Sequence, residues 1–584
     1  MTQLLKLNKN SFNDFYQTMH NKLSIEIINE LAIKAMAVVV LNENKLLRNQ
    51  DELRTIVEST EREYAEVFLQ NSHDILSNHL SPTMMNLLAD LSENQQKGLL
   101  TKENKQDWLH HLFNLQLGGK SDLFAFEESV YALCNQLFSS VEGDVYLTSG
   151  NATYHSLMLS EQQSVAAESI KSTNIPALLN LILGNIQYKV SDPILNPAYM
   201  QNGKLMPFKK GFLAEPWGMK ISLNEDAKQR FSVVSNNYQN YAIQHLWQQV
   251  SDFAIVAVPM NHLFSTVKSE IEMRKWLLEQ GHLKSIVAFP SGGFVKSTNI
   301  GFSLLIFDFT KIYDEVNLVS LKDSDFVERQ LRENKLTQID TLVEIINGKS
   351  NKISQRIAIE TLAKNDYVLD PERYIVDSQT EAALEILNQY ETATVGSFVE
   401  VLRPAPSLSK EEGKYSIFEI QGGDLPEYGY IDSISKTNQV EESQLKGLEK
   451  YYLKENDILI TIRGVTGKVG IVSKSLLEQY EGRVIAGKIC VVLRLQNAEK
   501  ITPLALLMQL RSEFCQSRLQ LLSSGATIAG LSVKDLKEFP IALFSLQKQQ
   551  ELAANFHQQA KIKQMIRQQE QEMKQIANNF WQTN

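Results

Sequence analysis

Two stretches near the C-terminus combine glycine, hydroxyl and basic side chains. Residues 456–472 read NDILITIRGVTGKVGIV, in which isoleucines alternate, the alternation breaks at Arg463-Gly464, and it then resumes. This pattern predicts a strand, a glycine turn that presents Arg463 and Lys468, and a second strand. Residues 523–539, SSGATIAGLSVKDLKEF, predict a glycine-rich loop that leads into a short helix. Hydroxyls, amides and cations on such loops suit contacts to phosphates and to base edges.

These two stretches, together with residues 414–425, 487–494 and 543–551, resemble the target-recognition domain of specificity subunits from type I restriction-modification systems. The resemblance covers roughly the last third of the chain and implies sequence-specific binding of double-stranded DNA. A solvated surface charge remains the alternative for each basic residue taken singly. The candidate DNA contacts are Arg463, Lys468, Arg483, Lys488, Thr527 and Lys534.

The middle of the chain, from about residue 123, alternates helices with short apolar strands, a pattern typical of a doubly wound (Rossmann-like) α/β sheet. The expected helices include residues 130–138 and 175–183. The expected strands are residues 144–147, 211–214, 253–258, 286–289 and 302–307.

Residues 252–264 and 289–306 of this region resemble the adenine-N6 methyltransferase (modification) subunits of the same type I systems. The resemblance implies S-adenosylmethionine as cofactor, with Glu168 where an acid binds its ribose and Asp192 where one meets its adenine. A turn-forming role for Asp192, which precedes a proline, is the alternative. The first loop of the family would place Ser149 and Gly150 at the cofactor.

Both motifs that make such an enzyme work are altered. The glycine-rich first loop of the family is replaced by residues 147–152, LTSGNA, with one glycine and no acid in the equivalent place. The family's Asn-Pro-Pro-Phe becomes Glu215-Pro216-Trp217-Gly218. We therefore expect a methyltransferase-like domain that is inactive and needs no cofactor. The alternative is an active enzyme in which Glu215, in the motif with Pro216, still accepts the adenine amino proton and Trp217 stacks on the flipped base.

The composition of the chain excludes several classes of protein. The 584 residues are 43% hydrophobic and 22% charged, which is typical of a globular protein of several domains. A net charge of −10 argues against a general polyanion binder but allows a local basic face. Three widely spaced cysteines predict a reducing cytoplasm and no zinc site. We see no signal peptide, no run of about 18 apolar residues that could span a membrane, and no phosphate-binding loop.

We therefore expect an α/β multidomain chain in five parts. These are a helical bundle (1–120), a methyltransferase-like domain (121–310), an extension and linker (311–395), a mixed α+β target-recognition domain (396–545) and a C-terminal coiled-coil helix (546–584). In the last part Ile562, Ile566, Met573, Ile576 and Phe580 follow a 3-4 spacing, with Gln569 at the remaining position. This seam predicts a homodimer, or assembly with other restriction subunits. Packing of the helix on its own domain is the alternative.

Overall fold

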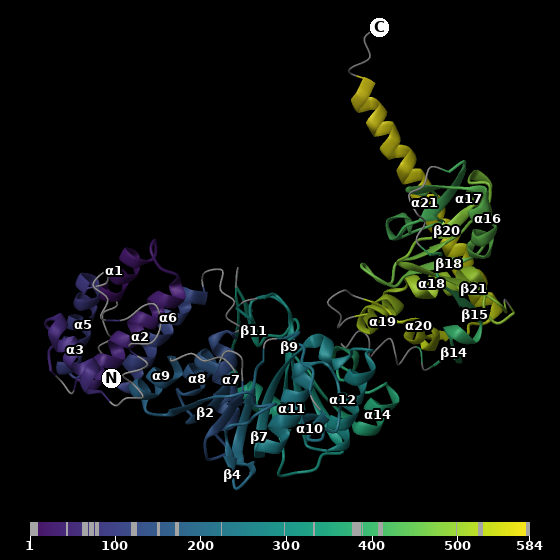
Figure 1. The fold of residues 1–584 in the computed structure, drawn as a ribbon. Coiled ribbons are helices and arrows are strands. Elements are labelled where there is room, and N and C mark those ends of the chain that lie inside the picture. Colours follow the sequence, from purple (N-terminus) through teal and green to yellow (C-terminus); the bar gives the residue numbers. More distant parts are fainter. Residues whose placement is uncertain are drawn as a thin grey trace. The chain divides into compact units, whose positions relative to one another are not determined.

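The structure is a computed structural model that divides the chain into two compact units, Met1–Pro371 and Glu372–Asn584. It describes residues 10–42, 45–60, 68, 75, 81–117, 125–148, 152–169, 175–215, 217–223, 225–296, 298–330, 333–375, 387, 389–406, 413–497, 499–523 and 530–579. Figure 1 shows the described helices and strands, from the N-terminal helices to the long C-terminal helix α21.

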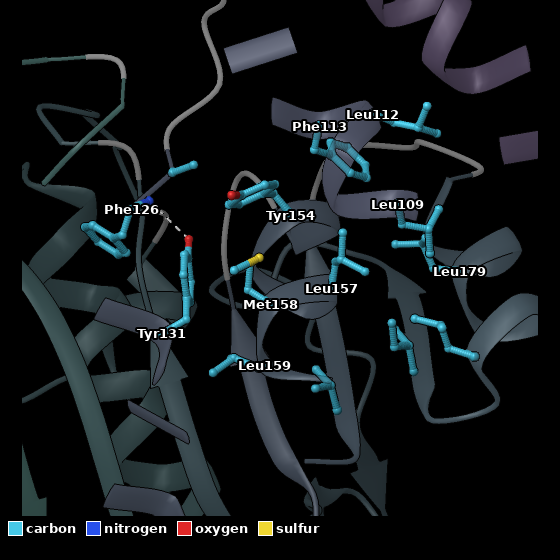
Figure 2. Packing of buried hydrophobic residues seen from close by; sticks show 14 of the residues in the cluster. Leu109, Leu112, Phe113, Phe126, Tyr131, Tyr154, Leu157, Met158, Leu159 and Leu179 are labelled. Carbon is cyan, nitrogen blue, oxygen red and sulfur yellow. Dashed lines mark hydrogen bonds between the residues drawn. The ribbon is translucent and has the colours of Figure 1, made fainter. Parts of the chain in front are cut away.

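The first unit begins with helices that pack around α2, whose sequence is apolar on nearly every face and most of whose residues are buried. Their core continues into the following domain without interruption. Figure 2 shows Leu109, Leu112 and Phe113 of α6 beside Tyr154 and Leu157 of α8. The helices are α1 (Asn10–Met19), α2 (Ile25–Leu41), α3 (Gln50–Ser59), α5 (Ser81–Gln96) and α6 (Lys102–Leu117).

A mostly parallel sheet forms the centre of this unit, in the order β13-β10-β8-β9-β7-β6-β1-β2-β3. Strand β9 runs antiparallel between β7 and β8, and β13 is antiparallel at one edge. Its strands are β1 (Val145–Thr148), β2 (Val165–Ser169), β3 (Ile186–Val190), β6 (Phe208–Leu213), β7 (Val250–Pro259), β8 (Leu283–Phe289), β9 (Phe302–Asp308), β10 (Glu315–Ser320) and β13 (Ser354–Ala358).

Helices cover the sheet, which explains why its central strands are continuous apolar runs rather than alternating ones. They are α7 (Glu128–Phe138), α8 (Ala152–Leu159), α9 (Ile175–Leu183), α11 (Tyr238–Gln249), α12 (Lys268–Glu279), α13 (Ile339–Ile346) and α14 (Ile359–Lys364). The predicted fold class, N-terminal helices followed by a methyltransferase-like sheet, is confirmed. The sheet extends past residue 310, because β10 and β13 lie in the range we assigned to an extension and linker.

The second unit is built from small sheets and short helices. A four-stranded antiparallel sheet has the order β15 (Val399–Leu402), β21 (Cys490–Leu495), β18 (Ile458–Thr461) and β19 (Val469–Ile471). A second sheet has the order β17 (Lys436–Val440), β16 (Tyr415–Ile420) and β20 (Val484–Ala486), and β14 (Thr392–Thr394) pairs with β22 (Pro540–Ala542). The helices include α16 (Glu442–Leu448), α17 (Lys474–Gln479), α18 (Pro503–Arg511), α19 (Glu513–Ser523) and α20 (Val533–Glu538).

Helix α21 (Leu546–Asn579) has two dissimilar halves. Its first turns pack on the second unit, where Phe556 is fully buried in the core. From residue 564 to residue 577 every residue is exposed. The predicted seam is therefore open to solvent, with Ile566 50% and Met573 62% exposed, and Phe580 lies outside the described residues. No helix in the described ranges is both long and apolar enough to cross a membrane.

Candidate functional site

The carboxyl ends of β1, β2 and β6 bring the predicted methyltransferase residues to one edge of the sheet. The parallel register pairs Thr148 of β1 with Glu168 of β2 and with Leu213 of β6. Glu215 follows two residues after Leu213, so both candidate acids lie at this edge. Ligands of open α/β sheets bind at such carboxyl ends. Ser149, Gly150 and Pro216 lie outside the described residues.

Glu168 lies at this edge but is fully buried and bonded to the protein itself. Tyr146 donates its hydroxyl hydrogen to Glu168 Oε2 at 2.8 Å, and the backbone N–H of Ala198 donates to Oε1 at 2.6 Å. The Ser191 hydroxyl also donates to Oε1. A carboxylate can accept about four hydrogen bonds, so little of its capacity remains for a ligand.

The polar chain that begins at Glu168 continues through Tyr146 to His245 and Arg230. Arg230 can only donate, so His245 Nδ1, at 2.9 Å, accepts from it. The pKa of His245 is lowered to about 3 by burial and by the charge of Arg230, so the ring is neutral and carries its hydrogen on Nε2. Nε2 then donates to the Tyr146 oxygen at 2.8 Å, which directs the tyrosine hydrogen to Glu168. Each hydrogen bond that links Arg230 to Glu168 thus has a defined donor and acceptor.

The Asp192 side chain accepts hydrogen bonds from the backbone that follows it. Its Oδ1 accepts hydrogen bonds from the N–H groups of Ile194, at 2.9 Å, and Leu195, at 3.1 Å. This is the turn-forming geometry that an Asp before a proline favours. The turn carries Ala198 toward Glu168, so Asp192 and Glu168 belong to one local structure.

Glu215 and Trp217, from the altered catalytic motif, both face inward. The Thr148 hydroxyl donates to Glu215 Oε1 at 2.8 Å, and Glu215 is only 3% exposed. Burial and the nearby charge of Glu215 raise the pKa of Tyr238. The Trp217 ring is half-buried against Phe302, with ring centroids 6.1 Å apart, and Phe302 stacks on Phe126 at 4.8 Å. The two side chains thus contribute to packing and to a buried hydrogen bond.

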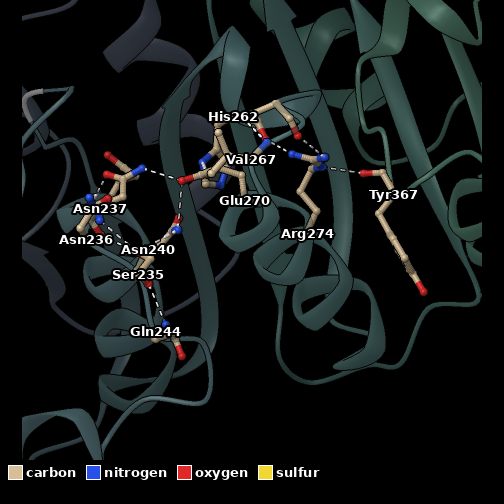
Figure 3. A network of polar contacts seen from close by, with 12 residues as sticks. Ser235, Asn236, Asn237, Asn240, Gln244, His262, Val267, Glu270, Arg274 and Tyr367 are labelled. Atoms are coloured by element: carbon tan, nitrogen blue, oxygen red, sulfur yellow. Dashed lines mark hydrogen bonds and ion pairs between the residues drawn. The ribbon is translucent and has the colours of Figure 1, made fainter. Parts of the chain in front are cut away.

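The segment after Trp217 is held by the polar network drawn in Figure 3. Lys220 pairs with Asn237 through the backbone, and the Asn237 side chain donates to Glu270 Oε1 at 2.9 Å. His262 Nδ1 lies 2.9 Å from Glu270 Oε2. Burial raises the pKa of Glu270. Hydrogen bonds from His262, Asn237 and Asn240, together with the charge of His262, outweigh this effect and lower the pKa to about 2. The network fixes the loop that carries Trp217.

In the second unit, the predicted strand, glycine turn and strand at residues 456–472 form the β18–β19 hairpin. Thr461 closes the loop, because its hydroxyl donates to Val465 O at 2.6 Å and accepts from Lys468 N at 3.0 Å. Gly464 and Gly467 have φ of +71° and +83°, conformations that suit glycine. Thr461 is buried, so its hydroxyl holds the loop together and does not face solvent.

Strand register gathers basic residues at one end of the four-stranded sheet. Thr461 pairs with Cys490 and Ile462 N bonds Ile489 O at 2.7 Å, which puts Arg463 beside Lys488. Lys468 enters β19 at the same end. Arg403, which sequence reasoning missed, follows the end of β15, where Leu402 pairs with Val492. These four residues, Arg403, Arg463, Lys468 and Lys488, are called the basic edge below. All four are exposed, and none forms an ion pair with a described residue.

The remaining candidate contacts are placed differently. Arg483 lies at the start of β20, the end away from Lys488, and is paired with Glu481. Lys534 is exposed on α20, a few residues after Gly530, which pairs with Arg463. Thr527 lies outside the described residues. The described ranges hold no group of His, Cys, Asp and Glu side chains that could bind a metal ion.

The comparisons with known proteins agree with this division. The N-6 DNA Methylase family model matches residues 151–383, and the type I restriction modification DNA specificity domain model matches residues 388–575. The chain therefore carries an N-6 DNA methylase domain and a type I restriction-modification specificity domain fused in one polypeptide.

Solved structures resemble the fold at low sequence identity. The methyltransferase subunit of a type I restriction-modification system from Streptococcus thermophilus is 12% identical, with a TM-score of 0.50 over 63% of this chain and 98% of that chain. The type IIG restriction endonuclease BpuSI is 13% identical, with a TM-score of 0.47 over 94% of this chain and 74% of that chain. No curated protein matches the chain in sequence.

Proposed function

We propose that this protein is the sequence-specific DNA-binding component of a type I restriction-modification-like defence system, and that its methylase domain does not transfer methyl groups. The observation that carries the proposal is the basic edge. Exposed cations without ion-pair partners among the described residues are free to meet DNA phosphates and guanine edges. The match to a specificity domain over residues 388–575 supports the same assignment.

Binding and sequence reading can be tested together. A DNA site is first selected from a random duplex pool with the wild-type protein, and its affinity is then measured by fluorescence anisotropy. The double variant Arg463→Ala, Lys488→Ala should weaken binding at least tenfold and relax the selected sequence, since an arginine bidentate to guanine contributes about 1–3 kcal/mol of discrimination. Lys454→Ala, Lys500→Ala is the matched control, because both lysines are exposed near the opposite end of the same sheet. Equal affinities for both variants would refute the proposal.

The proposed lack of methyl transfer is supported by Glu168 and Glu215. As arranged, the described residues do not fit S-adenosylmethionine, because the acid that would hold its ribose is buried and already accepts three internal hydrogen bonds. A buried carboxylate gives up such bonds only at a large cost in free energy. Calorimetric titration with S-adenosylmethionine, with and without DNA, should show no binding. Micromolar binding would overturn this part of the proposal.

An active adenine-N6 methyltransferase is the second candidate function. One observation favours this activity: the Glu215 carboxylate is a hydrogen-bond acceptor that follows the carboxyl end of β6, and the aromatic Trp217 lies two residues later in the chain. Site-specific adenine methylation in DNA from cells that express the protein alone would establish this activity. Loss of that methylation in Glu215→Ala, with the Thr148→Val variant as a control for the lost hydrogen bond, would assign it to this residue.

We also propose that the exposed half of α21 assembles the protein through a second copy. Ile562, Ile566, Met573 and Ile576 are each more than 40% exposed at a 3-4 spacing, a pattern that coiled coils bury. Ile566→Glu with Met573→Glu should give monomers by light scattering, as should deletion of residues 560–584. Gln564→Glu with Gln571→Glu, on another face of the helix, is the control and should keep the dimer. A monomeric wild type would refute self-assembly and leave a helix of another restriction subunit as the partner.

A further inference from the structure

A second cationic feature lies beside the basic edge and has no counterpart in the predicted contacts. It is a cavity of about 270 Å³ in the second unit. The buried Leu453, Ala486 and Val492, with the half-buried Leu402, make an apolar floor. The more exposed lining residues, Arg403, Lys450, Tyr451 and Arg494, form the rim. We propose that this pocket seats a phosphodiester of the DNA backbone, with the rim cations on the phosphate and the apolar floor against the sugar. The inference rests on the proposed DNA binding and goes further by assigning a contact to the backbone.

The cavity is held open by rigid elements. Arg494 donates from Nε and Nη2 to the two oxygens of the buried Asp457, at 2.8 and 2.6 Å, and from Nη2 to Tyr452 O at 3.2 Å. Leu453 N bonds Val484 O at 2.9 Å, which anchors the segment that carries Tyr451 to β20. A preformed site of this kind loses little conformational entropy when it binds.

The charges of the rim favour an anion. Asp457 neutralises Arg494, so the net positive charge comes from Arg403 and Lys450. Both are exposed and neither forms an ion pair with a described residue, although Lys450 Nζ lies 5.1 Å from the Tyr451 ring centroid. A phosphate would meet two uncompensated cations there without the loss of any ion pair.

The pocket adjoins the basic edge. Arg403 belongs to both, since it follows the end of β15 and also lines the cavity. Arg463 and Lys488 lie at the same end of the sheet. A duplex laid along this end can therefore place base edges against the hairpin loop and one backbone strand against the pocket. Phosphate contacts of this kind fix register and carry no sequence information directly.

The test measures DNA affinity as a function of salt. For the site selected by the wild type, Arg403→Ala with Lys450→Ala should lower the slope of log K against log salt by about 2, at roughly 0.9 for each lost contact. Affinity at ~0.1 M salt should fall roughly 10- to 100-fold, with the selected sequence unchanged. Arg403→Lys with Lys450→Arg should keep the slope, and the Lys454→Ala, Lys500→Ala control should match the wild type.

Other outcomes would overturn the inference. An unchanged slope in the alanine variant would show that these residues make no contact to the DNA backbone. A changed sequence preference at constant slope would show instead that they contact bases. A rise in Tm with inorganic phosphate, present in the wild type and absent in the alanine variant, together with an unchanged DNA slope, would assign the pocket to a free anion. If the wild type selects no DNA at all, the proposed function fails first and the inference fails with it.

Discussion

Replacing Tyr146 with phenylalanine tests whether Glu168 is structural. The change removes one oxygen that donates to Glu168 Oε2 and accepts from His245 Nε2, both at 2.8 Å. All three side chains are fully buried, so water cannot replace the lost bonds without rearrangement. A hydrogen bond to a charged group contributes about 1.5–3 kcal/mol, and an unsatisfied buried donor costs about 1–3 kcal/mol. Because the neighbours relax in part, we expect Tyr146→Phe to lower the free energy of unfolding by about 2–4 kcal/mol.

Urea denaturation followed by tryptophan fluorescence is a suitable assay. Trp108, Trp217, Trp247 and Trp276 all belong to the first unit, so the signal reports mainly on it. Tyr154→Phe is the matched control: Tyr154 is buried in the same unit and its hydroxyl makes no hydrogen bond to the described residues. We expect this control to change stability by less than about 1 kcal/mol. Equal effects of the two variants would refute the structural role of the Tyr146–Glu168 network.

Three further changes have expected outcomes of their own. Asp457→Ala leaves Arg494 without its bidentate partner and should destabilise the second unit by about 2–4 kcal/mol in urea, whereas Asp457→Asn should cost less. Arg511→Lys cannot reproduce the guanidinium bonds to three backbone carbonyls and should lower stability by about 2 kcal/mol, measured as a fall in Tm. The pKa of Glu270 is about 2, below its ordinary value of 4.5, so the carboxylate stabilises the fold above pH 4.5 and this stability is lost as pH falls toward 2. Denaturation curves of Glu270→Gln should lack that pH-dependent loss.

Much of the architecture could be predicted because it depends on local patterns. The apolar run at residues 253–258 predicts a strand covered on both faces, and it forms the centre of β7. The helix expected at residues 175–183 has the same bounds as α9. The glycine pair and the alternating isoleucines were sufficient to predict the β18–β19 hairpin. Period and turn chemistry are properties of neighbouring residues, so a single sequence contains them.

The contacts in the candidate sites depend on pairs of residues far apart in the chain. Tyr146 and His245 are 99 positions apart, and nothing in either local sequence indicates that they share a hydrogen bond. Arg403 joins Arg463 and Lys488 through strand register alone, although its place directly after an alternating strand was a usable signal. Arg483 was a reasonable candidate from composition, but its pairing with Glu481 depends on side-chain geometry.

Glu168 in the first unit and the basic edge in the second differ in their surroundings, and this contrast supports the proposed function. In the first unit Glu168 is buried and bonded, so recruiting it for a ligand would mean breaking the bonds that hold β1, β2 and the turn after β3 together. In the second unit the basic edge is exposed and has no ion-pair partner among the described residues, so its cations give up only hydration and counterions when a polyanion binds. We therefore expect a larger net gain in free energy from anion binding at the basic edge than from ligand binding at Glu168. This difference supports the proposal that the protein binds DNA and transfers no methyl group.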